Sequence, residues 1–148
     1  MNKDQLRQEL ADDEGCKYSV YLDHLNLPTF GIGHLITESD PEFGQPIGTE
    51  VSEERVRKAF NLDVAVTIDE CKVLYPDFDD LPEEAQLVIC NMMFNMGRPR
   101  LSKFKGMKAG VDARDWNKAA DEMVDSRWYT QVPNRARRLV DRMRALAD

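Results

Sequence analysis

The sequence predicts an α+β protein in which a small antiparallel sheet precedes a long helix and a cluster of further helices. Three observations support this class. Residues 17–36 combine strand formers with turn residues, which is typical of a hairpin or three-stranded sheet. Apolar residues recur at helical spacing over residues 52–74. Several helical patterns follow in residues 80–148, so strands and helices are segregated along the chain.

The first expected element is a short helix at about residues 2–12. Leu6 and Leu10 are four positions apart and therefore share one face of it. Glu14-Gly15 follows, and glycine commonly takes the left-handed conformation that ends a helix. We therefore expect the helix to end there.

A loop and a capped helix follow the predicted sheet. Residues 38–51 contain two prolines and two glycines, which predict a loop. Ser52 is suited to cap the long helix, which must end before Pro76. The apolar stripe of that helix consists of Val56, Phe60, Val64, Ile68 and Cys71.

Later helices are expected at about residues 82–97, 112–124, 126–130 and 134–146. Pro82 suits the first turn of a helix, and the helix that it opens is apolar around much of its circumference. That pattern indicates a central place in the core. Trp116, Trp128 and Tyr129 stand at helical positions and are interpreted as core residues.

Composition and charge exclude several classes of protein. No run approaches the ~18 apolar residues of a spanning helix, and the first ten residues lack the apolar stretch of a signal peptide. We expect a soluble chain that is made in the cytoplasm and does not insert stably into a membrane. The net charge is −7, which argues against a nucleic-acid partner. Residues 38–84 carry 14 acidic and 4 basic side chains, whereas residues 85–148 carry 13 basic and 7 acidic ones, so two faces of opposite charge are expected.

The cysteines and histidines give no sign of a disulfide or a metal. Cys16, Cys71 and Cys90 are odd in number and widely spaced, and His24 and His34 lack zinc-site spacing. We expect free thiols, buried in the fold, and neither a metal nor a cofactor.

Two carboxyl groups are candidates for catalysis. Glu14 lies where the first helix is expected to end, and Asp23 lies in the facing strand region. Glycoside hydrolysis generally requires one protonated carboxyl group and one ionised carboxylate that flank the scissile bond. With 27 acidic residues in the chain, the bare pair is weak support for this chemistry.

The surrounding motifs strengthen the interpretation because they keep a fixed order over almost the whole chain. They are Asp13-Glu14-Gly15, Tyr21-Leu22-Asp23, Thr29-Phe30-Gly31-Ile32-Gly33-His34-Leu35, Phe60-Asn61-Leu62-Asp63, Asn91-Met92-Met93-Phe94-Asn95-Met96-Gly97 and Ser126-Arg127-Trp128-Tyr129-Thr130-Gln131-Val132-Pro133-Asn134-Arg135-Ala136. The set resembles the lysozymes of T-even bacteriophages, glycoside hydrolase family twenty-four.

This resemblance implies one lysozyme domain with two lobes. The sheet-containing lobe is expected at about residues 14–51, the connecting helix at 52–74, and the helical lobe at 80–148 together with residues 2–12. The substrate would lie in a cleft between the lobes. The implied reaction is inverting hydrolysis of the β-1,4 bond between N-acetylmuramic acid and N-acetylglucosamine in peptidoglycan, for lysis of a bacterial host by a phage.

The resemblance also implies residue roles. Glu14 would be the general acid and Asp23 its ionised partner, while Thr29 would hold the attacking water. Gly33 would let a sugar approach the backbone, and Leu35 and Phe94 would line the cleft wall. The peptide stems of the substrate would be contacted by Arg127, Gln131 and Arg135. A monomer is implied, released to the wall in the periplasm with help from a holin-type protein.

His34 is interpreted as structural and paired with Asp63 on the long helix. The chain departs from the resemblance in its shorter loop after His34, in its acidity, and in the identities of Leu25, Met107 and Glu122. Two alternatives stay open. A lytic transglycosylase would need one catalytic glutamate and no water-activating carboxylate, and a wall-binding module would have kept the fold and lost turnover.

Overall fold

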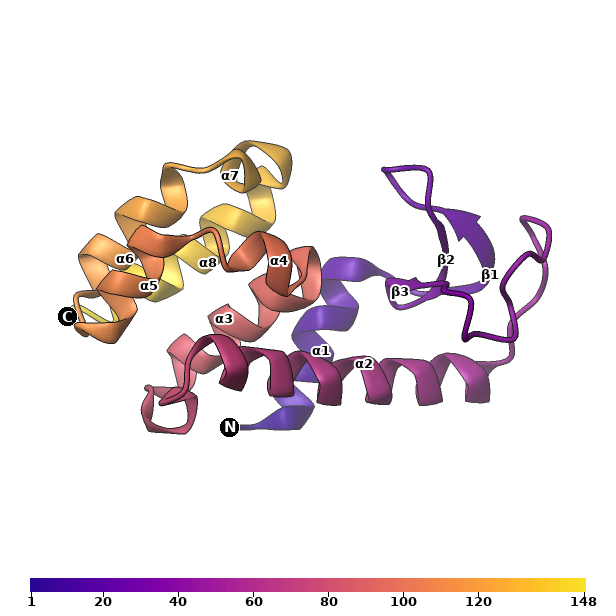
Figure 1. Ribbon diagram of the computed structural model, residues 1–148, viewed down its shortest axis with the longest axis horizontal. Coiled ribbons are helices and arrows are strands. Elements are labelled where there is room, and N and C mark those ends of the chain that lie inside the picture. Colours follow the sequence, from indigo (N-terminus) through magenta and orange to yellow (C-terminus); the bar gives the residue numbers. More distant parts are fainter. The chain divides into compact units, whose positions relative to one another are not determined.

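The computed structural model describes residues 1–148 and confirms the predicted α+β class (Figure 1). It has three strands, eight α-helices and one short 3-10 helix, η1. In chain order the elements are α1 (Lys3–Glu14), β1 (Lys17–Leu22), β2 (Pro28–Gly31), β3 (His34–Leu35), α2 (Glu53–Leu74), η1 (Phe78–Asp80), α3 (Glu83–Met96), α4 (Arg98–Leu101), α5 (Lys105–Asp112), α6 (Trp116–Val124), α7 (Arg127–Gln131) and α8 (Pro133–Ala145).

The chain divides into two compact units, which we call the sheet unit and the helical unit. The sheet unit comprises residues 7–66, and the helical unit comprises residues 1–6 together with residues 67–148. The division falls inside α1 and inside α2, so each of these helices contributes to both units.

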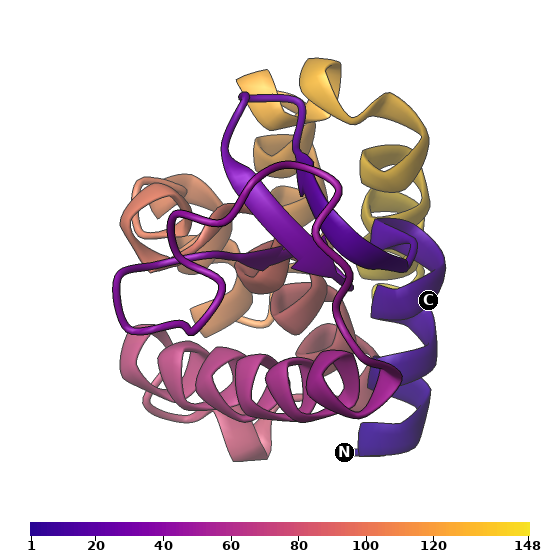
Figure 2. The same cartoon turned by 90° about the vertical axis from the view of Figure 1, so that its right-hand side faces the viewer.

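In the sheet unit, the three strands form an antiparallel sheet in the order β1-β2-β3 (Figure 2). Thr29 pairs with Tyr21 on β1 and with Leu35 on β3. The connection from β2 to β3 is tight because Gly31 and Gly33 both have φ of +63°, a left-handed conformation that glycine adopts without a steric penalty.

The predicted loop after β3 is irregular, but its end returns to the sheet. The backbone of Val20 pairs with the loop in both directions: its N–H donates to Thr49 and its carbonyl accepts from Gly48. Behind the sheet lies an apolar core that unites strands, loop and helix α2. Its members are Val20, Phe30, Ile36, Val51, Val56 and Ala59.

The local signals at the helix ends are as the sequence predicts. Gly15 has φ of +73° directly after the last residue of α1. Ser52 Oγ accepts the backbone N–H of Arg55 at 3.1 Å and so caps α2. Gly97, with φ of +79°, follows the last residue of α3.

In the helical unit, the predicted helix at 112–124 was wrong in its start, and α4, α5 and η1 were missed. The chain instead breaks after Asp112. Arg114 takes a left-handed conformation, with φ of +58°, and the side chain of Asp115 then caps α6 by accepting the N–H of Lys118. A Cβ at Gly110 would lie 2.6 Å from the backbone nitrogen of Ala119, so the helices α5 and α6 pack with backbones in close approach.

Helix α3 is buried over most of its length, which confirms its predicted place in the core. The indoles of Trp116 and Trp128 are buried too, as expected. Trp128 Nε1 donates to Asn95 Oδ1 at 2.8 Å, so the polar edge of this ring is satisfied. None of the helices combines the length and the apolar character that crossing a membrane demands.

A network of charged side chains ties the loop after β3 to helix α2. His34 Nδ1 lies 2.7 Å from Asp63 Oδ2, and His34 Nε2 lies 3.0 Å from Asp40 Oδ2. Arg55 continues the network: its guanidinium donates to both oxygens of Glu42 and to Asp40 Oδ1, at 3.0–3.1 Å. The imidazole is therefore held between two carboxylates, an arrangement that favours its protonated form.

Burial alone lowers the pKa of His34, but the hydrogen bonds and negative charges of Asp63 and Asp40 outweigh it, so the pKa is raised above the usual 6.5. Burial likewise raises the pKa of Asp40, yet the Thr37 N–H and the charges of His34 and Arg55 hold it below its usual 3.8. The histidine therefore stabilises the fold most below about pH 6.5, and this contribution disappears as pH rises through its raised pKa. The contribution of Asp40 is complete above about pH 3.8 and disappears on acidification.

We predict that His34→Gln removes a pH dependence as well as stability. At pH 5.5 the free energy of unfolding should fall by about 1–3 kcal/mol, because charge-assisted hydrogen bonds are lost. The parent should lose part of its stability between pH 6 and pH 9, and the variant should lose less over that interval. Urea denaturation across this pH range measures both, with the exposed His24 changed to Gln as the control. Equal pH slopes in His34→Gln and the parent would contradict the network.

Candidate active site

The last residue of α1 is Glu14, and its carboxyl group lies against the turn between β2 and β3. A Cβ built on Gly33 would be 2.7 Å from Glu14 Oε1 and 3.2 Å from Glu14 Cδ. The first of these separations is shorter than a real Cβ atom adopts and the second is tight, so the absent side chain of Gly33 makes room for the carboxyl group. Two requirements therefore fall on Gly33: its backbone is left-handed, and Glu14 leaves no room for a side chain.

Asp23 follows the last residue of β1 and organises the β1–β2 turn. Its Oδ1 accepts the backbone N–H groups of Leu25 at 2.8 Å and Leu27 at 2.9 Å. Its own N–H donates to the carbonyl of Leu27, and Asn26 completes the turn with φ of +61°. This carboxylate is thus fixed by two backbone donors and stays half-buried rather than swinging freely in solvent.

Thr29 lies on β2, and only 3% of its surface is exposed. Its hydroxyl donates to the Leu27 carbonyl at 2.9 Å. Since a hydroxyl has a single hydrogen, the oxygen of Thr29 has only its acceptor capacity left for any further partner.

Tyr21 on β1 connects the two carboxyl groups electrostatically. Burial raises the pKa of its phenol, and the negative charges of Glu14 and then Asp23 raise it further. Lys17 places its ammonium 4.4 Å from the centre of the same ring. In the sequence, Tyr21 belongs to the Tyr21-Leu22-Asp23 motif but receives no role of its own. Its position on β1, opposite Thr29, is the signal that could have identified it.

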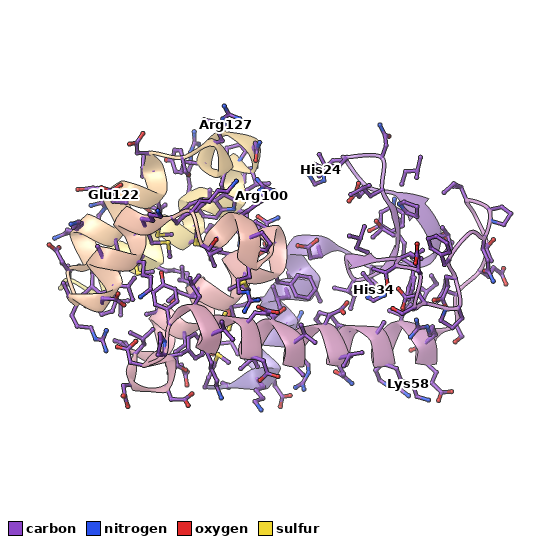
Figure 3. All side chains as sticks on the ribbon, in the orientation of Figure 1. His24, His34, Lys58, Arg100, Glu122 and Arg127 are labelled. Atoms are coloured by element: carbon purple, nitrogen blue, oxygen red, sulfur yellow. The ribbon has the colours of Figure 1, made fainter.

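The remaining predicted site residues differ in how exposed their side chains are. Leu35 on β3 is 47% exposed, whereas Phe94 on α3 is partly buried. Arg127 on α7 is exposed (Figure 3), and so is Gln131 on the same helix. Gln131 Oε1 accepts a hydrogen bond from Arg100 on α4 at 3.0 Å.

Arg135 on α8 differs in burial from Arg127 and Gln131. Only 8% of its surface is exposed, and its Nε donates to Asn91 Oδ1 at 2.7 Å. This guanidinium is a buried link between α8 and α3. A part in substrate binding stays a prediction for Arg135, as it does for Arg127 and Gln131.

The two histidines lie in different surroundings. Figure 3 shows His24 in the β1–β2 turn, away from His34 and its carboxylates. The structure brings His34 and Asp63 together, and it adds Asp40 as a second partner that the sequence did not indicate. No group of three histidine, cysteine, aspartate or glutamate side chains in residues 1–148 is arranged to hold a metal ion.

Glu14 at the end of α1 and Asp23 directly after β1 supply the two carboxyl groups that a glycoside hydrolase requires, next to a small antiparallel sheet with a buried threonine. Comparison with known proteins identifies which kind. Residues 11–145 match the family described as Phage lysozyme, and the chain belongs to that family of glycoside hydrolases.

Curated relatives align over most of the chain. Two proteins of Dictyostelium discoideum, "Probable T4-type lysozyme 2" and "Probable T4-type lysozyme 1", are 30% and 28% identical to it, and each alignment covers 91% of both chains. The "Pre-baseplate central spike protein Gp5" of Enterobacteria phage T4 is 29% identical over 90% of this chain, which spans 26% of that longer protein.

We predict that Gly33→Ala lowers the rate of glycan hydrolysis far more than it lowers stability. The new methyl group meets the far end of the Glu14 side chain, which can rotate aside at little cost to folding but then leaves its position. The turnover number should fall about tenfold or more, in line with the sensitivity of catalysis to small displacements of a reacting group.

Gly44→Ala is the matched control for this variant. Gly44 has φ of +81° and no atom within 4 Å of the place that a methyl group would take, so its substitution reports backbone strain without a clash. Thermal denaturation and steady-state kinetics of both variants separate the two effects. If both variants lose activity equally, the placement of Glu14 by Gly33 is wrong.

Proposed function

We propose that this protein cleaves the glycan strands of bacterial peptidoglycan at the β-1,4 bond between N-acetylmuramic acid and N-acetylglucosamine. The observation that carries the proposal is the disposition of Glu14, Asp23 and Thr29 around one small sheet. The family supports the choice of substrate, and so does a 29% identical relative named "Peptidoglycan hydrolase gp36" from Pseudomonas phage phiKMV, of which this chain spans 15%.

Glu14 is the general acid in this proposal. It donates its proton to the glycosidic oxygen as the bond to the leaving sugar breaks. Its place at the end of α1, against the backbone of Gly33, leaves the carboxyl group few orientations, and a proton donor in a fixed position is more effective than a mobile one.

Asp23 and Thr29 act on the water. The two backbone N–H groups that donate to Asp23 Oδ1 fix the direction of its carboxyl group. The carboxylate accepts a proton from the attacking water. The Thr29 oxygen, whose own hydrogen is donated to the Leu27 carbonyl, accepts a hydrogen bond from the other hydrogen of that water. Attack of this water from the face opposite the leaving group inverts the anomeric configuration.

The rest of the predicted site is assigned to substrate binding. We infer that Gly33, Leu35 and Phe94 contact sugar rings, and that Arg127, Gln131 and Arg135 are directed to the peptide stems. An arginine fork matches the carboxylates of such stems in geometry and charge. We also propose that the protein acts as a monomer in bacterial host lysis by a phage, and that it reaches the wall in the periplasm through a membrane opened by a holin-type protein.

Glu14→Gln should abolish product release from purified peptidoglycan without unfolding the protein. General acid catalysis contributes a factor of about 10²–10⁴, so the variant should lose at least about a hundredfold in rate. The soluble products of the parent are weighed by mass spectrometry, and their anomeric form directly after cleavage is read by NMR. Reducing muropeptides released in the inverted form support the proposal.

Other products from the same experiment identify the alternatives. Anhydro-muramyl ends would show a lytic transglycosylase, in which Asp23→Asn would also retain activity. Tight binding to peptidoglycan with no products from the parent would show a wall-binding module.

Access to the wall is tested in bacteria that express the protein. If a separate protein must open the membrane, cultures should keep their turbidity until chloroform permeabilises the membrane, and should then clear rapidly. Glu14→Gln serves as the control and should not clear under either condition. Clearing of the intact culture before chloroform would contradict the need for a holin-type protein.

A further inference from the structure

Two buried cysteine side chains of the helical unit lie in contact. Cys71 is near the end of α2 and Cys90 is in the middle of α3, and both are 0% exposed. Their sulfur atoms are 3.8 Å apart. The third cysteine, Cys16, is exposed in the sheet unit, just before β1.

We propose that Cys71 and Cys90 form a disulfide site, which is oxidised by a disulfide donor and then stabilises the helical unit. A disulfide bond requires the sulfur atoms to approach to about 2.05 Å. The two sulfur atoms would have to approach by roughly 1.7 Å, and rotation about the Cα–Cβ bond of each cysteine is the movement that we propose for this approach.

The chemistry is thiol–disulfide exchange with a donor R–S–S–R, such as oxidised glutathione or the disulfide of an oxidoreductase. The thiolate of one cysteine attacks a donor sulfur, forms a mixed disulfide and releases one R–SH. The thiolate of the other cysteine attacks the protein sulfur of the mixed disulfide and releases a second R–SH. The two cysteines lose two electrons, the donor gains them, and the two protons leave on the released thiols.

Burial determines when this exchange takes place. The neighbouring thiol of Cys90 and the loss of water raise the pKa of Cys71, so in the packed protein Cys71 stays in the unreactive thiol form. A donor also cannot reach sulfur atoms that have no exposed surface. The disulfide therefore forms before α2 and α3 pack, or when they open transiently.

The bond would close a segment that is already ordered. Between the two cysteines, the Gln86 side chain donates to the carbonyls of Phe78 and Leu81, each at 3.0 Å, and Tyr75 and Phe78 are almost fully buried. A cross-link across an ordered segment of this kind mainly restricts the unfolded chain. Oxidation should therefore raise the stability of the folded protein without changing its structure.

The inference adds to the proposed function, because a wall-degrading enzyme leaves the reducing compartment in which it is made and meets disulfide donors. Its test needs no peptidoglycan, so its failure is distinct from a failure of the proposed function. The variant Cys16→Ser removes the exposed thiol and leaves only the pair.

Cys16→Ser is unfolded, refolded in a glutathione redox buffer, and then alkylated under denaturing conditions. The expected product has lost two hydrogens by intact mass and takes up no alkyl group. Its circular dichroism should equal that of the reduced protein, and its thermal midpoint should be roughly 5–10 °C higher and return to the reduced value with dithiothreitol.

Three results would overturn the proposal. They are uptake of two alkyl groups, accumulation of mixed glutathione adducts in place of the intrachain bond, and a disulfide that lowers the thermal midpoint. The double variant Cys16→Ser/Cys90→Ser is the control, since its single thiol can form only a mixed disulfide. Where this variant fails to fold, Cys16→Ser/Cys90→Ala replaces it, because alanine places no polar group in the buried site.

Discussion

The tight turn between β2 and β3 is the constraint on which the sheet unit depends. Two glycines with φ of +63° reverse the chain within a few residues. That reversal sends Phe30 into the core and brings His34 within reach of the carboxylates of helix α2 and the loop. It also turns the bare backbone of Gly33 toward Glu14. The backbone geometry of this one turn thus positions the core, the charged network and the carboxyl group that we propose as the general acid.

Ion pairs add to the stability that the sheet unit gains from its apolar core. Its core cluster is small, and the two carboxyl groups that we propose as catalytic are only partly buried. Polar groups kept at a site for function generally cost stability. Arg55 and His34 offset part of this cost by neutralising Asp40, Glu42 and Asp63. Part of the acidic excess of residues 38–84 is therefore internal structure and needs no external partner.

Features that depend on a few neighbouring residues could be predicted from the sequence, and features that depend on distant ones could not. The ends of α1 and α2 follow from Gly15 and Ser52, each of which acts on its own turn of helix. By contrast, the break before α6 depends on one left-handed residue, Arg114, whose type gives no warning of it. The second partner of His34 and the contact of Cys71 with Cys90 arise only when separate elements pack.

The two residues that we propose as catalytic show the same division between local and distant determinants. Glu14 and Asp23 could be singled out because motifs of fixed order surround them, yet the sequence says nothing of what holds them. Asp23 is fixed by two N–H groups of its own turn, so its orientation is a local property that any substitution preserving the turn should leave intact. Glu14 is bounded by a residue nineteen positions away that has no side chain. Its position therefore depends on the folded sheet, and loosening the sheet should impair the acid before it impairs its partner.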